Sequence, residues 1–222
     1  MAFRSLWIMT VVTAAVSTAL PRVAPAQSPV PIPAPLLNGG GINDWVTTLN
    51  NEAATPRDRE EAARRLIARQ TPETDAAVRA ALENFGSAGA QVAVATALGD
   101  DTTPDARLIA PLFALLGPNR AATTAAASAL GMYKDDPGVL QRLSTDAMNK
   151  ARPEHVRIAV IRAMGAIPSK RSARTLSEQI FFPEDESLPV RNVAADALIE
   201  MTGLSENERD AQRWRQWWQG VS

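Results

Sequence analysis

Few side chains in this sequence of 222 residues could carry acid–base or nucleophilic chemistry. There is no cysteine and a single histidine, His155, which excludes disulfides, thiolate catalysis and Cys-ligated metal sites. A Ser-His-Asp arrangement would have to use His155, and no GxSxG sequence follows a predicted strand. The glycines at 38–41 and 86–89 lack the strand-and-helix context of a phosphate loop. The sequence therefore predicts no catalytic residues, no cofactor and no metal ligands.

Three consecutive acids at 184–186 are the remaining candidate for chemistry, as a site for a cation. They lack the spacing and the central glycine of an EF-hand loop. We expect a solvated loop there, longer than the other turns of the chain. We also expect His155, which stands beside Glu154, to be a lone surface imidazole.

Two groups of residues are better suited to binding a partner than to transforming a substrate. A basic group lies between residues 56 and 69, and its candidates are Arg57, Arg64, Arg65 and Arg69. It could bind carboxylates or sulfated polymers, although Glu60 and Glu61 also permit a solvated face of i, i+4 ion pairs. The second group is aromatic and consists of Trp214, Trp217 and Trp218.

The three tryptophans share one face of a predicted C-terminal helix, 205–220. Their spacing is i, i+3 and i+4, and the sequence at 205–208 has the pattern of a capping box. Such a face could cover the last structural unit of the chain. It could also anchor a partner, since tryptophan is enriched at binding hot spots.

Charge and composition limit the classes of partner and of fold. The 23 basic and 24 acidic residues give a net charge of −1, so no strong field would hold nucleic acid or an anionic membrane. Hydrophobic residues make up 45% of the chain, which is enough for a core, and aromatic residues only 5%. Runs of alanine favour helices that pack closely through small side chains.

The N-terminal segment is typical of a targeting sequence. Arg4 precedes an apolar run, Pro21 breaks it, and Ala24 and Ala26 supply the small-x-small pattern of a signal peptidase site. Residues 1–26 are thus predicted to be a signal peptide, with an uncleaved anchor as the alternative. Residues 27–41 follow as a proline- and glycine-rich linker. We therefore expect an exported protein, periplasmic or secreted, with no stable membrane span after cleavage.

One pattern returns five times between residues 62 and 198. Its anchors are spaced by 32, 32, 34 and 34 residues, and a small or β-branched residue stands four positions before each of them. This i, i+4 pairing predicts one buried stripe of a helix, and a period near 33 accommodates two helices and two turns. The anchors are Leu66, Leu98, Leu130, Met164 and Leu198.

Prolines recur at similar intervals and indicate where helices begin. Proline is tolerated at the first helical position, and Thr55-Pro56 and Thr103-Pro104 look like a cap followed by a first residue. No run of alternating apolar and polar residues predicts a strand. The sequence therefore predicts an all-α fold. Further predicted starts are Pro72, Pro118, Pro137, Pro153, Pro168 and Pro189.

The segment 108–130 resembles a HEAT repeat, with Pro111 in the interior of a kinked first helix. Residues 155–165 and 189–198 resemble the second helix of the family. Both carry an arginine seven positions before the anchor, Arg157 and Arg191, and Arg59 has the same offset. Gln91 and Thr123 depart from this pattern. In the family such arginines reach acids or carbonyls of neighbouring repeats.

This resemblance implies an armadillo-like α-solenoid of about five helical-hairpin repeats, residues 42–222, with 205–220 as its C-terminal capping helix. Tetratricopeptide repeats share the period but need more aromatic residues. The resemblance implies a non-enzymatic scaffold or adaptor of a bacterial envelope, whose concave surface binds a protein or an extracellular polymer. The alternatives are a structural or self-assembling envelope element and, more distantly, a HEAT-like bilin lyase.

Overall fold

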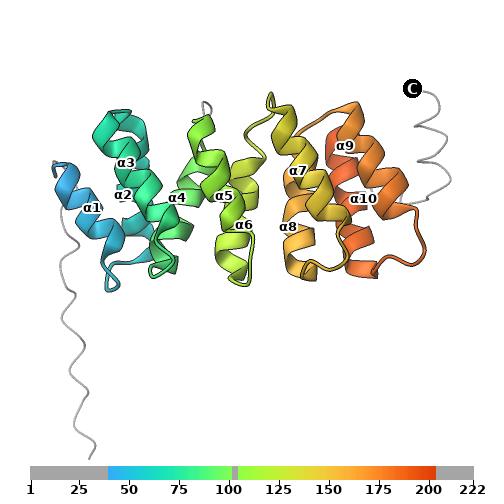
Figure 1. Cartoon of the computed structure of the whole chain (residues 1–222), viewed down its shortest axis with the longest axis horizontal. Coiled ribbons are helices and arrows are strands. Elements are labelled where there is room, and N and C mark those ends of the chain that lie inside the picture. Colours follow the sequence, from blue (N-terminus) through green and yellow to red (C-terminus); the bar gives the residue numbers. More distant parts are fainter. Residues whose placement is uncertain (1–39, 102–104, 204–222) are drawn as a thin grey trace, which may run out of the picture. The chain divides into compact units, whose positions relative to one another are not determined.

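The computed structural model describes residues 40–101 and 105–203, which all belong to one unit, Leu36–Ser222. These residues form α1 (Ile42–Asn50), α2 (Pro56–Arg69), α3 (Pro72–Glu83), α4 (Ala88–Gly99), α5 (Ile109–Ala114), α6 (Arg120–Leu130), α7 (Pro137–Met148), α8 (Glu154–Gly165), α9 (Lys170–Arg174) and α10 (Leu188–Thr202) (Figure 1). A 3-10 turn, Ala106–Leu108, precedes α5, and a π-helical segment, Thr175–Phe181, continues α9. No strand occurs in these two ranges, so the all-α prediction is confirmed.

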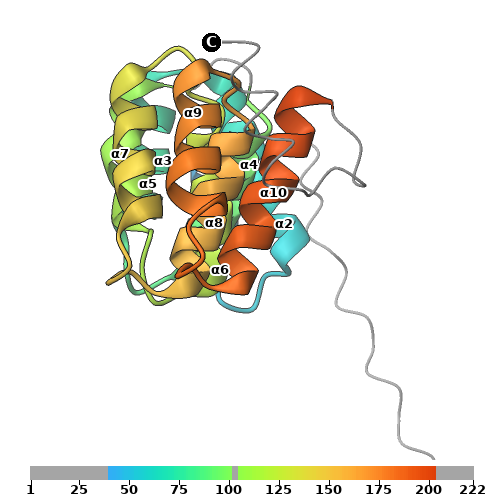
Figure 2. The same ribbon diagram turned by 90° about the vertical axis from the view of Figure 1, so that its right-hand side faces the viewer.

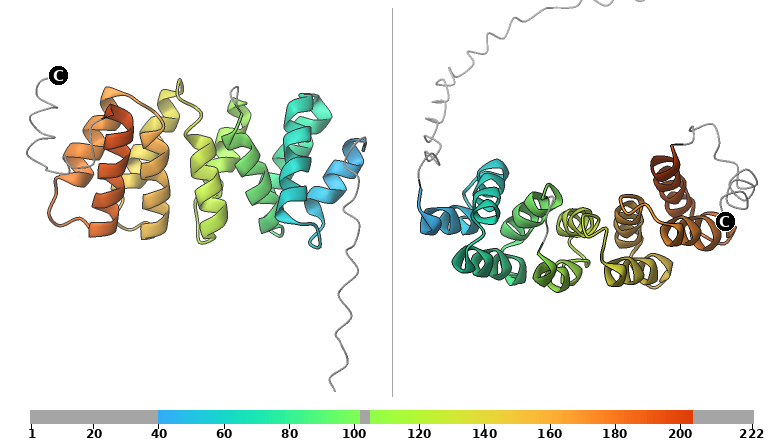
Figure 3. Two further views of the ribbon diagram at one scale, coloured as in Figure 1. Left: turned by 180° about the vertical axis from the view of Figure 1, so that it is seen from behind. Right: turned by 90° about the horizontal axis from the view of Figure 1, so that it is seen from above.

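The helices lie in two layers. The first layer consists of α2, α4, α6, α8 and α10, each packed against the next in chain order. The second layer consists of α3, α5, α7 and α9 with its π-helical continuation (Figures 2 and 3). Each second-layer element packs on the first-layer helix that follows it in the sequence, and α1 packs on α2.

The core lies between the layers and follows the predicted stripe. All five anchors are buried, with exposed fractions of 0 or 1%. The residues four positions earlier are completely buried as well. They are Ala62, Val94, Ala126, Val160 and Ala194. Each first-layer helix buries one apolar stripe against its neighbours. This burial holds the two layers together, because removing apolar surface from water lowers the free energy of the folded chain.

Helix starts follow the proline pattern to within two residues. Pro56 and Pro137 occupy the first position of α2 and α7, where Thr55 and Asp136 cap the free backbone N–H groups. Pro153, by contrast, is itself the N-cap of α8, and Pro118 precedes the cap of α6, Asn119. Thr103 and Pro104 lie outside the described residues.

Pro111 lies in the first turn of α5, so its predicted place in a helix interior is wrong. The 3-10 turn before it ends at Leu108, and α5 begins at Ile109. A proline so close to a helix start does not remove a hydrogen bond from an established ladder. The local change of helix type therefore accommodates a residue that a continuous helix would disfavour.

A glycine directly follows three of the anchors, where two first-layer helices come closest. A Cβ atom at Gly165 would lie 2.9 Å from the Cβ of Ala197 on α10. At Gly131 it would lie 3.2 Å from the Cβ of Ala166, just after α8, and at Gly99 it would lie 3.4 Å from Oγ of Ser128 on α6. Because glycine has no side chain, neighbouring helices of the first layer can approach each other closely at these three positions.

Several predictions fall on other parts of the chain. The predicted signal peptide, 1–26, the linker up to residue 39 and the helix 205–220 lie outside the described residues. Among the helices of 40–101 and 105–203, none combines the length and the hydrophobicity that crossing a bilayer requires.

Candidate partner-binding surfaces

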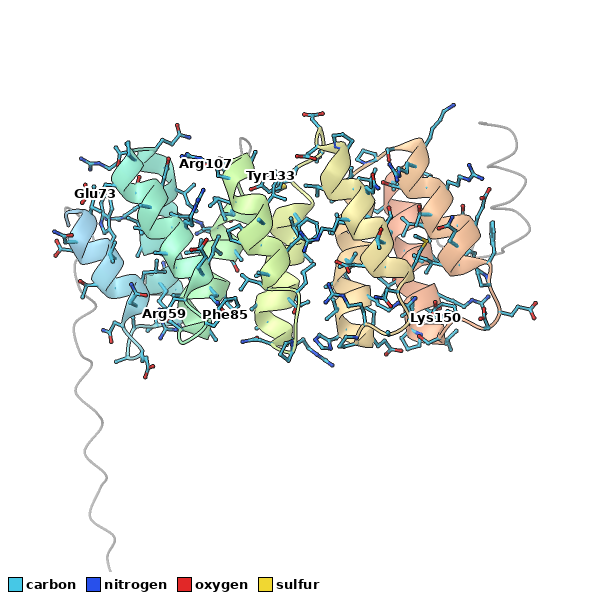
Figure 4. All side chains as sticks on the ribbon, in the orientation of Figure 1. Arg59, Glu73, Phe85, Arg107, Tyr133 and Lys150 are labelled. Carbon is cyan, nitrogen blue, oxygen red and sulfur yellow. The ribbon has the colours of Figure 1, made fainter. Side chains whose placement is uncertain are left out.

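The predicted basic group lies on α2, whose start is fixed by local contacts. Oγ1 of Thr55 accepts a hydrogen bond from the backbone N–H of Asp58 at 3.1 Å. The guanidinium of Arg59 donates to the carbonyl oxygens of Asn51 and Glu52, just after α1 (labelled in Figure 4). Arg59 is therefore used to hold α2 against α1. The other arginines of α2 are exposed or half-buried.

Arg64 and Arg65 are both paired with acids. Nη2 of Arg64 contacts Glu60 on its own helix and lies 2.9 Å from Oδ2 of Asp100, at the end of α4. These carboxylates raise the pKa of Arg64, with the hydrogen bond to Asp100 the largest cause. Nε of Arg65 lies 2.9 Å from Oε1 of Glu61. This part of α2 is thus a face of ion pairs rather than a free basic patch.

Arg57 and Arg69 lie at opposite ends of α2, and both are exposed. Arg69 stands over the ring of Trp45 from α1, with its guanidinium carbon 5.8 Å from the ring centroid. Arg57 forms no ion pair with any residue of the described part. Of the four arginines, Arg57 is the one whose charge is available without breaking an existing contact.

The aromatic candidates, Trp214, Trp217 and Trp218, lie outside the described residues. What the structure adds beside α2 is a stretch of short side chains. The exposed or half-buried positions of α4 and α6 include Val92, Thr96, Thr124 and Ser128. The middle of the first layer therefore presents small, mostly uncharged side chains, and charged ones begin at α2.

One set of polar contacts recurs at the position seven residues before each anchor. In every case the side chain donates to a carbonyl oxygen at or just after the end of the preceding helical element. Nε of Arg157 donates to Ala147 at 2.8 Å and Nε of Arg191 to Phe181 at 3.1 Å. Nε2 of Gln91 donates to Leu82 at 3.0 Å. With Arg59 and Thr123, the set has five members.

Thr123 takes part in this set with a hydroxyl in place of a guanidinium. Its Oγ1 lies 3.2 Å from the carbonyl oxygen of Leu115 and 3.0 Å from that of Gly117, and it accepts from the N–H of Gly117. Gln91 and Thr123, which depart from the arginine pattern, thus make the same kind of contact with a carbonyl oxygen. The carbonyl contacts of this set stay within one helical pair, so the predicted contact with a neighbouring repeat is found for Arg157, which reaches Glu186, but not for Arg191.

Replacing Thr123 with valine is expected to lower the free energy of unfolding by about 1.5 kcal/mol. The substitution keeps the shape of a completely buried side chain but leaves the carbonyl of Leu115 and the N–H of Gly117 without this partner. Urea unfolding followed by circular dichroism measures the loss. The adjacent Thr124→Val is the matched control, because the exposed Thr124 hydroxyl bonds only within its own helix. Equal effects at the two positions would contradict the prediction.

The acidic segment 184–186 is solvated only in part. Glu184 and Asp185 are exposed, and Asp185 pairs with Lys150 at 2.7 Å (Lys150 is labelled in Figure 4). Glu186 is buried, and its two carboxylate oxygens accept from Nη1 and Nη2 of Arg157. The prediction of a solvated loop is therefore wrong at Glu186, since α8 lies against this segment.

The paired guanidinium of Arg157 lowers the pKa of Glu186, and the N–H of Ser187, which donates to Oε1 at 2.9 Å, acts in the same direction. Each of the three guanidinium nitrogens of Arg157 thus donates to Ala147 or Glu186. The pair joins the end of α7, the first turn of α8 and the segment before α10.

His155 is less exposed than predicted. Its Nε2 lies 3.0 Å from the carbonyl oxygen of Gly117, which comes from the loop before α6, and the side chain is half-buried. Nearby, Asp146 is held by Arg152, whose Nη1 donates to the carbonyl of Leu116. His155 thus contributes to the contact between adjacent helical pairs. No group of three or more metal-binding side chains gathers anywhere in the described ranges.

No protein-family model and no curated protein sequence matches this chain. Its surfaces therefore have to be interpreted from their own chemistry.

The described part of the chain also has hollows that no sequence pattern predicts, and two of them lie between helical elements. One, of about 240 Å³, is lined by residues from α2, α3 and α4 and by Asp105 and Arg107. Arg107 there pairs with Asp75 at 2.8 Å and with Asp105, and this pairing lowers the pKa of Asp105. The other, of about 430 Å³, lies between α7 and the α9 region. Each collects residues more than 25 positions apart, which only the packing of the helices brings together.

Proposed function

We propose that this chain is a non-enzymatic scaffold of the cell envelope, exported to the periplasm or beyond, that binds another macromolecule along its first helical layer. The proposal takes the fold as a HEAT-like α-solenoid of about five helical-hairpin units. The observation that carries it is the set of donors at the position seven residues before each anchor. Five equivalent contacts support five equivalent units, and stacked units offer a long surface.

The chemistry of the first layer also favours binding over catalysis. Its charged end, α2, carries paired arginines together with Arg57, and the middle presents short side chains from α4 and α6. Such a surface suits a partner that lies along several helices and places acidic groups near α2. The preferred partner is thus a protein with an acidic patch, and the candidate contacts are Arg57, Arg64, Arg65 and Arg69.

Affinity capture from detergent-solubilised native envelope tests this function. A tagged chain is expected to retain a stoichiometric partner, and Arg57→Glu is expected to reduce the recovered amount at least fivefold. Arg57 is changed because it has no ion pair to lose, so the effect reports on the surface and not on folding. Mass spectrometry identifies and quantifies the partner.

The matched control is Arg79→Glu, an exposed arginine of α3 in the second layer. It changes the net charge as Arg57→Glu does and is expected to leave capture unchanged. Equal loss with both variants would show that only net charge matters. The scaffold proposal fails if the unsubstituted chain retains no macromolecule. If its mass by light scattering also increases with concentration, the result supports a self-assembling element.

A further inference from the structure

The hollow between α7 and the α9 region is a groove of about 430 Å³ on the second layer, away from the surface proposed above. We call it the α7–α9 groove. One wall comes from α7 and includes Gln141, Thr145 and Met148, and the other includes Arg171, Thr175 and Gln179. Ser144 and Arg174 complete it.

Positive charge dominates this groove. None of its lining residues is acidic. Arg174 pairs with Glu178 at 2.9 Å, whereas Arg171 is exposed and has no acid partner in the described part of the chain. The neighbouring Lys170 adds a third basic side chain to α9. In a chain with a net charge of −1, this local excess of cations favours an anionic ligand.

The hydroxyl groups of the α7 wall are oriented by their own helix. Oγ of Ser144 donates to the carbonyl of Leu140 at 2.8 Å, and Oγ1 of Thr145 donates to that of Gln141 at 3.0 Å. Their protons are therefore used, and their oxygen atoms can only accept from a ligand. The wall thus offers acceptors for N–H groups beside the guanidinium that would take an anion.

Thr175 adds a free hydrogen-bond donor to the groove. Its side chain is more than nine-tenths buried and lines the groove, and its hydroxyl forms no hydrogen bond with any residue of the described ranges. This hydroxyl is not one of the buried polar atoms that lack a partner, so it stays accessible from the groove. It can therefore donate to a ligand that enters the groove.

The backbone of this wall is also unusual. Thr175 begins the π-helical segment Thr175–Phe181, and the N–H of Phe182 donates to the carbonyl of Ser177, five residues earlier, at 2.9 Å. π-helical turns are rare and occur frequently at functional sites. Here the wider turn carries Thr175 and Gln179, which both line the groove.

We propose that the α7–α9 groove binds the carboxylate of an extended peptide. Arg171 takes the carboxylate, the Thr175 hydroxyl donates to the peptide, and the amides of Gln141 and Gln179 bond to its backbone from opposite walls. The half-exposed Met148 contacts an apolar side chain of the peptide. The carboxylate comes from a C-terminus or from an acidic side chain, and the two sources share this chemistry.

Three acetylated pentapeptides added at millimolar concentration to the full ¹⁵N-labelled chain test the proposal. The first is pentaalanine with a free C-terminal carboxylate, the second is its C-terminal amide, and the third is that amide with a central glutamate. The expected result is a saturable shift of the Gln141 and Gln179 side-chain NH2 signals with the first or the third peptide, and none with the second. A shift with the first peptide alone would identify a C-terminal carboxylate as the ligand. A shift with the third peptide alone would identify an acidic side chain.

Absence of a shift with both carboxylate peptides, or an equal shift with all three, would overturn the proposal. Arg171→Gln is expected to weaken binding about tenfold, because a charge-assisted hydrogen bond is lost. Arg79→Gln, on α3, is the matched control and should leave binding unchanged.

Thr175→Val separates ligand binding from a structural role. Because the hydroxyl has no partner within the described structure, valine is expected to keep or raise the melting temperature. The same variant is expected to bind the carboxylate peptide several-fold more weakly. A clear drop in melting temperature would show that the hydroxyl serves the fold and would overturn its assignment to a ligand.

Discussion

Glu186→Gln is expected to lower the free energy of unfolding by about 3 kcal/mol. The variant keeps the size of the side chain but leaves the guanidinium of Arg157 charged, buried and without its counter-ion. Removing one partner of a buried pair costs about 3–5 kcal/mol, far more than an exposed ion pair contributes. Urea denaturation at pH 7, followed by circular dichroism, measures the change.

Removing both charges provides the control. Arg157→Met combined with Glu186→Leu leaves no uncompensated charge, and buried pairs are often replaced by apolar residues at little cost. We expect the double variant to be more stable than Glu186→Gln, although it loses the bond to the carbonyl of Ala147. Asp185→Asn, which breaks the exposed pair with Lys150, should leave the free energy of unfolding almost unchanged. An effect at Asp185 as large as that at Glu186 would contradict this account.

The Arg157–Glu186 pair makes a contribution to the free energy of unfolding that depends on pH. The pKa of Glu186 is lowered in the folded state. The stabilisation is therefore fully present above the ordinary glutamate pKa of about 4.3, and it is lost as the pH falls through the lower folded-state value. The difference in stability between the unsubstituted chain and Glu186→Gln should stay constant from pH 7 to 5 and shrink below about pH 4.

Gly165→Val is expected to destabilise the protein by about 3 kcal/mol. A Cβ atom at this position would lie 2.9 Å from the Cβ and 3.3 Å from the Cα of Ala197. The second contact is with backbone, so α8 and α10 would have to separate. Thermal unfolding should show a lower melting temperature. Gly117→Val, where no atom lies within 4 Å of the added Cβ, is the matched control and should destabilise the protein much less.

A double-mutant cycle identifies the cause. Gly165→Ala and Ala197→Gly each cost stability alone, but together they exchange the positions of a glycine and an alanine across the same contact. We expect a favourable coupling free energy of about 1 kcal/mol between them. Strict additivity would show that the loss at Gly165 arises elsewhere.

The layered core could be predicted from the sequence to a large extent. The five anchors and the residues four positions before them report on a single helix face, and that face is set by local periodicity. Helix starts were predictable to within two residues, because caps and prolines act locally. Pro111 was misplaced because a change from 3-10 to α-helix leaves no trace in an apolar pattern.

Contacts across the layers were predicted less well. The roles of Gln91 and Thr123 depend on how closely the preceding helix approaches, and the sequence does not show that distance. Glu186 looked like its exposed neighbours, yet it meets Arg157 from 29 residues earlier. Two of the four arginines of the basic group proved ion-paired, and their i, i+4 pairs on α2 follow from spacing. The contact of Arg64 with Asp100, at the end of α4, does not. Such meetings arise from packing, not from spacing.

The short side chains on α4 and α6 have a consequence for how tightly a partner can be held. Val92, Thr96, Thr124 and Ser128 have few rotamers, and most are already restricted by their helix. A partner that docks on them therefore freezes little side-chain motion, whereas immobilising a long charged side chain costs about 0.5–1.5 kcal/mol each. On α2, the arginines held by Glu60, Glu61 and Asp100 have already lost part of that freedom. The first layer is thus conformationally prepared before any partner arrives, and much of the entropic cost of association falls on the partner.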